Sequence, residues 1–155
     1  MFCETPPVEE VEQVIENIDT YGWHCVHVPQ MGHQLAFTYT IGLYLSFKHP
    51  ELLVYGANAK AACDMIKYVG MAARDDEALD LDQPTDQLMD GHSCVFVEVP
   101  YLNFPERIEL GIRFYQGVSF PLRQIVWTSN QGLFPWHPES SVRFRASQSL
   151  LVPIH

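Results

Sequence analysis

The chain has 155 residues, of which 47% are hydrophobic and 18% charged, so its composition excludes a disordered chain and a fibrous repeat. This length predicts a single domain over residues 1–155 with a core of its own. Nineteen acids against nine Lys and Arg give a formal net charge of −10. No apolar run approaches the ~18 residues of a membrane span, and the N-terminus has no leader pattern, so we expect a cytoplasmic protein without a membrane partner.

The acids are concentrated in the first part of the chain. Residues 1–90 carry 15 acids and four bases, whereas residues 91–155 carry four acids and five bases. Such a chain repels phosphate backbones and has no Lys/Arg stripe, so we expect no nucleic-acid partner. The same field favours a basic protein partner. The densest acidic stretch, residues 75–90, fits a solvated loop or a docking patch, and it lacks the ligand order of a calcium loop.

Apolar residues at steps of three and four predict an amphipathic helix up to about residue 21. Its stripe consists of Val8, Val11, Ile15 and Ile18. Residues 23–28 then have the pattern of a strand, and residues 30–34 that of a turn. The next strand, residues 35–41, alternates bulky and small side chains, so one face is apolar and the other small and lightly polar. The small face lets a helix, a second sheet or a ligand approach the backbone.

The rest of the chain alternates short strands with helices. In order, we predict a strand at 51–55, a helix at 58–74, the acidic loop, a strand at 93–99, a helix at 106–116, a strand at 122–127, a loop at 128–141 and a last short strand at 142–145. Five or six strands with about three helices indicate an α+β fold. Short early connections favour antiparallel neighbours, so we expect a mostly antiparallel, curved five- to six-stranded sheet, with a barrel-like closure as an alternative.

Four cysteines, Cys3, Cys25, Cys63 and Cys94, are scattered without a C-x-x-C pair. This pattern predicts free thiols in a reducing compartment. A thiol nucleophile needs a Cys and a His that meet in space, which the sequence alone does not decide. A serine hydrolase is not indicated, because no G-x-S-x-G turn is present.

A metal site depends on whether His24 or His27 approaches His92. The spacing argues against it, because His24 and His27 face opposite ways on one strand and no H-E-x-x-H occurs, so we predict no metal. The usual phosphate-binding glycine loops are also absent. Thr38 and Thr40 offer another way to hold a phosphate, although threonine also simply suits β-structure.

Polar and aromatic residues combine near the end of the chain. Gln124 lies on an otherwise apolar strand face, where a polar group must find a partner. Trp127 ends that strand, and Phe134 and Trp136 follow in the loop. Such a loop either packs its aromatic rings on the core or exposes them as a pocket wall or partner site.

Three blocks occur together: Tyr21-Gly22-Trp23; FTYTIGL at 37–43 with HPEL at 49–52; and QIVW at 124–127 with GLFPW at 132–136. This order resembles the bacterial family catalogued as domain of unknown function 4262, over about residues 8–138, with residues 139–155 as a C-terminal extension. The resemblance implies an acid soon after Trp127, where this chain has Thr128, Ser129 and Asn130. It also implies a shared site at Tyr39, Thr40, Gly42, His49, Glu51, Gln124, Trp127 and Trp136.

Each implied site residue also has a structural alternative. Gly42 can serve only a bend in the backbone. His49 and Glu51 form an acid–base pair only if their side chains meet, and otherwise the segment merely turns the chain into the next strand. If the acid after the tryptophan is catalytic in the family, a chain without it lacks that activity.

These observations favour a small acidic domain that binds a protein partner or a small molecule as a binding or regulatory module. The alternative is an enzyme or cofactor-binding domain. The strands at 35–41 and 51–55 and the helix after them look like the flavin-reductase type of split barrel, in which a strand end rich in Thr or Ser holds the flavin phosphate. No cofactor is favoured, and the residues do not decide whether the protein is an enzyme.

Overall fold

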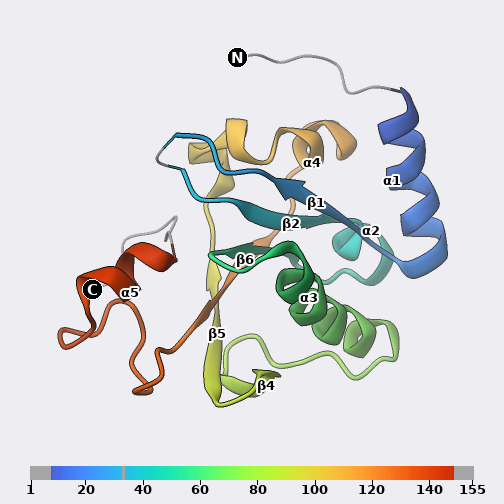
Figure 1. Cartoon of the computed structure of the whole chain (residues 1–155). Coiled ribbons are helices and arrows are strands. Elements are labelled where there is room, and N and C mark those ends of the chain that lie inside the picture. Colours follow the sequence, from blue (N-terminus) through green and yellow to red (C-terminus); the bar gives the residue numbers. More distant parts are fainter. Residues whose placement is uncertain (1–7, 33, 149–155) are drawn as a thin grey trace.

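Six strands form one mixed sheet in the order β1-β2-β3-β6-β5-β4 (Figure 1). The computed structural model describes residues 8–32 and 34–148. The strands are β1 (His24–Val28), β2 (Phe37–Ile41), β3 (Glu51–Tyr55), β4 (Thr85–Met89), β5 (His92–Glu98) and β6 (Leu122–Trp127). The helices are α1 (Val8–Tyr21), α2 (Leu43–Phe47), α3 (Ala59–Arg74), α4 (Glu109–Phe114) and α5 (Val142–Ser147), with two 3-10 turns, η1 (Tyr101–Asn103) and η2 (Pro105–Arg107).

The sheet is open, with β1 and β4 as its edges over the described residues. Four of its pairings are antiparallel, whereas β3 and β6 run parallel with Glu51 opposite Leu122. After β3 the chain crosses through α3 to β4 and returns through β5, so that β6 lies beside β3. The α+β class and the six strands are confirmed. The barrel-like alternative is wrong, and the described residues hold five α-helices where about three were expected.

The two faces of the sheet bury separate apolar clusters. Bulky side chains of β2, Phe37 and Tyr39 among them, pack with α1 and with the segment between β5 and β6. Leu52 and Val54 of β3 pack with α3 on the opposite face. The predicted alternation along β2 therefore decides which layer covers each face, because successive side chains point to opposite sides of a strand. The stripe of the first helix is partly wrong, since Ile15 is 49% exposed.

Three elements differ from the sequence-based predictions. Residues 142–145 belong to α5 and not to a strand, because the Ser141 side chain caps the helix by accepting a hydrogen bond from the Phe144 amide at 3.0 Å. β4 forms within the stretch expected to be an acidic loop. α2 was not predicted at all.

No described helix is long and apolar enough to cross a membrane. Cys3 and the tail after residue 148 lie outside the described residues.

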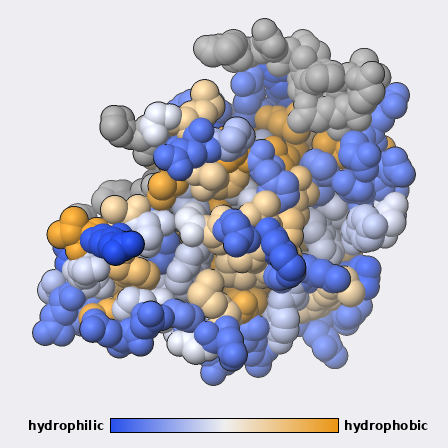
Figure 2. Space-filling model, in the orientation of Figure 1, coloured by the Kyte–Doolittle hydropathy of each residue, from blue (hydrophilic) through white to orange (hydrophobic). Residues whose placement is uncertain are grey.

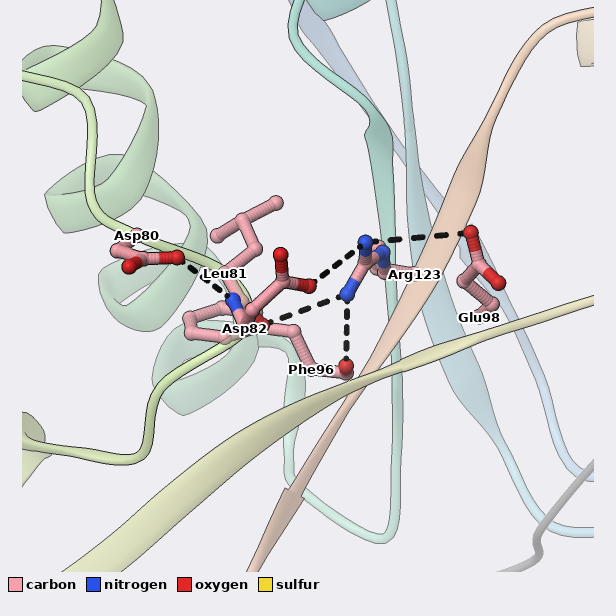
Figure 3. Close-up of polar contacts among 6 residues, drawn as sticks. All are labelled: Asp80, Leu81, Asp82, Phe96, Glu98 and Arg123. Atoms are coloured by element: carbon pink, nitrogen blue, oxygen red, sulfur yellow. Dashed lines mark hydrogen bonds and ion pairs between the residues drawn. The ribbon is translucent and has the colours of Figure 1, made fainter.

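The acidic segment before β4 is attached to the sheet through Arg123 of β6 (Figure 3). The Arg123 guanidinium donates to the backbone carbonyls of Leu81 at 3.3 Å and Phe96 at 3.2 Å. It also pairs with the carboxylates of Asp82 at 3.3 Å and Glu98 at 3.9 Å. Both carboxylates are exposed, so the bond to the Leu81 carbonyl contributes more to this attachment than the ion pair with Asp82. One Asp of the acidic stretch is thus used inside the fold, and docking of a basic partner stays a prediction.

Candidate functional site

Three predicted site residues, Thr40, Gly42 and Glu51, meet at the start of α2. The Glu51 side chain is fully buried. Its Oε1 accepts hydrogen bonds from Thr40 Oγ1 at 2.7 Å and from the Leu43 amide at 3.1 Å. Its Oε2 accepts from the amides of Gly42 at 2.9 Å and Tyr44 at 3.2 Å. The carboxylate therefore caps the first turn of α2, where backbone amides have no partner within the helix.

The hydroxyl of Tyr115 completes this cage by donating to Glu51 Oε2. Burial raises the pKa of Glu51, and the hydrogen bonds from Tyr115, Thr40 and the backbone act in the opposite direction. Burial and the adjacent Glu51 carboxylate raise the pKa of Tyr115, which keeps its hydroxyl protonated as a donor. Gly42 has a φ of +116° that other residues rarely adopt. Because the carboxylate is enclosed by donors and has no exposed surface, the cage supports the fold and is closed to a substrate.

Three further predicted residues, Tyr39, Gln124 and His49, are also buried. Tyr39 belongs to the core on the α1 face, and Gln124 lies in β6 between Leu53 of β3 and Val97 of β5. The His49 Nδ1 donates to the Pro50 carbonyl at 2.7 Å, whereas its buried Nε2 has no hydrogen-bond partner among the described residues. Burial lowers the pKa of His49 and keeps its ring neutral.

His49 and Glu51 thus bond to different groups. Within the described part of the chain, the structure places no hydrogen bond between their side chains. The acid–base pair considered for them is not formed.

Of the two predicted tryptophans, Trp127 directly precedes the loop at 128–141 and Trp136 lies within it. Trp136 is half-buried and stacks on Phe134, with ring centroids 4.9 Å apart and planes 5° apart. The Phe134 carbonyl accepts from Ser140 Oγ at 2.6 Å and from the His137 amide at 3.0 Å, which closes the loop on itself. The aromatic pair is therefore part of a folded loop. Trp127 ends β6 and lines a cavity that is described below.

This cavity has a volume of about 760 Å³ and lies beyond the carboxyl end of β6. Its walls come from the start of β5, the loop after β6 and α5. The lining residues are His92, Trp127, Thr128, Ser129, Asn130, Gln131, Glu139, Ser140, Ser141, Arg143, Phe144 and Ser147. Figure 2 shows hydrophobic and strongly hydrophilic residues side by side on the surface over the α5 region. A cavity of this size with a few polar groups is typical of small-molecule sites.

Thr128 fixes the orientation of His92 at one wall of the cavity. The Thr128 amide donates to the Ser93 carbonyl at 3.0 Å, and Thr128 Oγ1 accepts from the Ser93 amide at 3.1 Å. The Thr128 carbonyl lies 2.7 Å from His92 Nδ1. A carbonyl only accepts, so His92 Nδ1 carries the proton of this hydrogen bond.

The opposite wall, α5, is fixed at its end to the sheet. The carboxamide of Gln148 is buried, accepts from the Trp127 amide at 3.2 Å and donates to the Trp127 carbonyl at 3.1 Å. Arg145 donates to the carbonyls of His137 and Pro138, which joins the helix to the loop. Gly56, after β3, leaves room for the Ser147 carbonyl, which would lie 2.1 Å from a Cβ at that position.

The family model described as a domain of unknown function, DUF4262, matches residues 17–141. The chain belongs to this family. The match spans most of the chain and includes the β6 wall and the loop of the cavity. Searches of curated proteins and of solved structures found no match.

Four of the eight DUF4262 motif positions lie at two separate places in this structure. Thr40, Gly42 and Glu51 build the cage at α2, whereas Trp127 and the residues where the resemblance expects an acid, Thr128 to Asn130, line the cavity. The cavity wall formed by Arg143, Phe144 and Ser147 lies beyond the matched residues.

The metal and flavin alternatives gain no support from the geometry. His27 lies on β1 and His92 on β5, with three strands between them. Over the described residues, no group of three or more His, Cys, Asp or Glu is arranged to hold a metal ion. The hydroxyls considered for a flavin phosphate bond inside the protein, Thr38 to His27 and Thr40 to Glu51.

Glu139 and Arg143 were not predicted as site residues from the sequence, and His92 was considered only as a metal ligand. Arg143 was expected on a strand, where its neighbours would have been different. The sequence did contain one indication of a helix here: Ser141, directly before the segment, is a residue type that commonly caps helices. The cavity itself depends on how α5 packs against β6, which no local pattern shows.

Proposed function

We propose that this domain binds a small zwitterionic molecule in the cavity beside α5. The single observation that carries this proposal is that two opposite charges without an ion-pair partner among the described residues, Arg143 and Glu139, line the same cavity. Both side chains are exposed, and neither makes a side-chain ion pair or hydrogen bond with another residue in the described part of the chain.

The charges specify the class of ligand. A simple anion would pair with Arg143 but would be repelled by Glu139. A simple cation would pair with Glu139 but would be repelled by Arg143. A molecule with both an ammonium and a carboxylate group satisfies the two side chains together. All lining residues belong to the nearly neutral part of the chain after residue 91, so the strong acidity of residues 1–90 lies outside the cavity wall.

The remaining lining residues favour a ligand with a flat or apolar portion. Trp127 and Phe144 contribute aromatic residues to the walls, and Asn130 and Gln131 contribute amides. His92 contributes an imidazole from the β5 side. An amino acid with an aromatic side chain is the simplest molecule with all of these features, and it is small relative to 760 Å³.

Three matched probes test the proposal: L-phenylalanine, 3-phenylpropanoate, which lacks the ammonium, and 2-phenylethylamine, which lacks the carboxylate. Isothermal titration should rank phenylalanine as the tightest of the three. Arg143→Ala should weaken phenylalanine binding about tenfold, the equivalent of one charge-assisted hydrogen bond. Glu139→Gln should remove the preference for phenylalanine over 3-phenylpropanoate, because the repulsion against a simple anion is gone.

Arg74→Ala is the matched control, since Arg74 is also exposed but lies at the end of α3, outside the cavity lining. It should leave all three affinities unchanged. Equal affinity for the three probes, or an equal loss in Arg74→Ala and Arg143→Ala, would contradict the proposed zwitterion site.

A further inference from the structure

A thiol and an imidazole meet between the edge strand β1 and α3, away from the cavity described above. Cys63 Sγ lies 3.6 Å from His27 Nε2, within hydrogen-bonding distance for sulfur. The other ring nitrogen, His27 Nδ1, lies 2.9 Å from Thr38 Oγ1 of β2. Thr38 orients the ring by this bond, so that a nitrogen faces the sulfur. The arrangement is that of a nucleophile, a base and a group that orients the base.

A second thiol lies beside the first. Cys25 is two residues before His27 on β1, so both side chains project from the same face of the strand, toward α3. Burial, together with the electrostatic interaction with the neighbouring Cys63, raises the pKa of Cys25. Both cysteines are free and half-buried. Cys25 therefore stays a protonated thiol next to Cys63, which has the imidazole as its base.

The two sulfurs open onto a cavity of about 390 Å³. It is lined by residues of α1, β1 and α3, and it shares none of them with the cavity beside α5. The lining residues are Asn17, Tyr21, Trp23, His24, Cys25, His27, Cys63, Lys67 and Met71. A small molecule therefore has both space and access at the thiol pair.

We propose that Cys63 and Cys25 form a dithiol site that reduces low-molecular-weight disulfides. His27 Nε2 takes the proton of Cys63, and the resulting thiolate attacks one sulfur of the disulfide, whose S–S bond breaks. The first leaving thiolate takes the proton back from His27. The product of this step is a mixed disulfide on Cys63.

The second step uses the adjacent thiol. Cys25 gives up its proton, and its thiolate attacks the Cys63 sulfur. The Cys25–Cys63 bond forms as the mixed disulfide breaks, and the second leaving thiolate takes up the proton. One disulfide is thereby reduced to two thiols, and the protein dithiol supplies the two electrons. The pair of sulfurs favours this reaction over acyl transfer, which needs one nucleophilic thiol and has no use for a second.

The probe is bis(2-hydroxyethyl) disulfide, which is small relative to the cavity, and the readout is intact-protein mass spectrometry with peptide mapping. The wild-type protein should lose the mass of two hydrogen atoms and yield a Cys25–Cys63 peptide. Cys25→Ala should stop at an adduct of one mercaptoethanol on Cys63. Cys63→Ala should form neither product, and His27→Ala should react with the disulfide about tenfold or more slowly at neutral pH while circular dichroism shows a retained fold.

Cys94→Ala serves as the control, because Cys94 is a fully buried thiol of β5 outside this cavity. It should react as the wild-type protein does. The proposal is overturned if the wild type forms no Cys25–Cys63 bond, if Cys25→Ala accumulates no adduct on Cys63, or if folded His27→Ala reacts at the wild-type rate. None of these outcomes bears on the zwitterion site, which shares no residue with the dithiol.

Discussion

Replacing Glu51 by Gln is expected to lower the free energy of unfolding by about 2–4 kcal/mol, although the two side chains have nearly the same shape. Both carboxylate oxygens accept from a backbone amide, Oε1 from Leu43 and Oε2 from Gly42 and Tyr44. A carboxamide has one acceptor oxygen and one NH₂ group. In either orientation, the NH₂ of Gln therefore faces a backbone N–H inside a site without water access.

Urea unfolding followed by circular dichroism measures this loss. For a domain of this length, about 3 kcal/mol corresponds to a drop in Tm of about 6–12 °C. Glu77→Gln is the matched control, since Glu77 is exposed, and it should change the stability by less than about 0.5 kcal/mol. A Glu51→Gln variant as stable as the control would show that the cage does not support α2.

Replacing Gly56 by Ala is expected to displace α5 and to abolish ligand binding beside it. Gly56 has a φ of +81°, which costs Ala about 1–2 kcal/mol. A Cβ there would also lie 2.1 Å from the Ser147 carbonyl oxygen, and backbone cannot yield as a flexible side chain can. Overpacking adds about 1–3 kcal/mol unless α5 moves away. Movement of α5 relieves the clash, so the sheet should remain folded while the cavity wall is lost.

Hydrogen exchange over residues 142–148 and phenylalanine titration test this effect together. Gly117→Ala separates the clash from the backbone strain, because Gly117 has a φ of +79° but no atom lies within 4 Å of the position that its Cβ would take. Gly117→Ala should lower the stability by the backbone strain alone and should leave hydrogen exchange at α5 unchanged. Identical exchange at α5 in the two variants would contradict the role given to Gly56.

The strands were predictable where the pattern is local. The alternation in residues 35–41 predicted β2 and its two faces, and the strand predicted at 122–127 has the bounds of β6. α2 could not be predicted in this way, because its cap is the side chain of Glu51, which follows the helix in sequence. The parallel pairing of β3 with β6 joins segments about 70 residues apart, and no short-range pattern specifies it.

The candidate site was predictable only in part. The resemblance supplied eight positions, but Thr40, Gly42 and Glu51 hold the fold, and Tyr39, His49 and Gln124 are buried. Motif residues can therefore report a shared architecture without marking a shared reaction. Trp127 is the predicted position that does line the cavity. Arg143 and Glu139 were not predicted as cavity residues, because the cavity depends on the position of α5. Gln148 and Gly56 hold this helix against the strand ends.

The most direct test of the zwitterion site is a titration of ¹⁵N-labelled wild-type protein with L-phenylalanine, followed by amide chemical shifts. Our account predicts saturable shifts confined to the start of β5, the loop after Trp127 and α5, with the largest changes near Glu139 and Arg143. The same shifts should be weaker with 3-phenylpropanoate and with 2-phenylethylamine. An absence of shifts at these residues at millimolar probe concentrations, or saturable shifts centred elsewhere, would contradict the account.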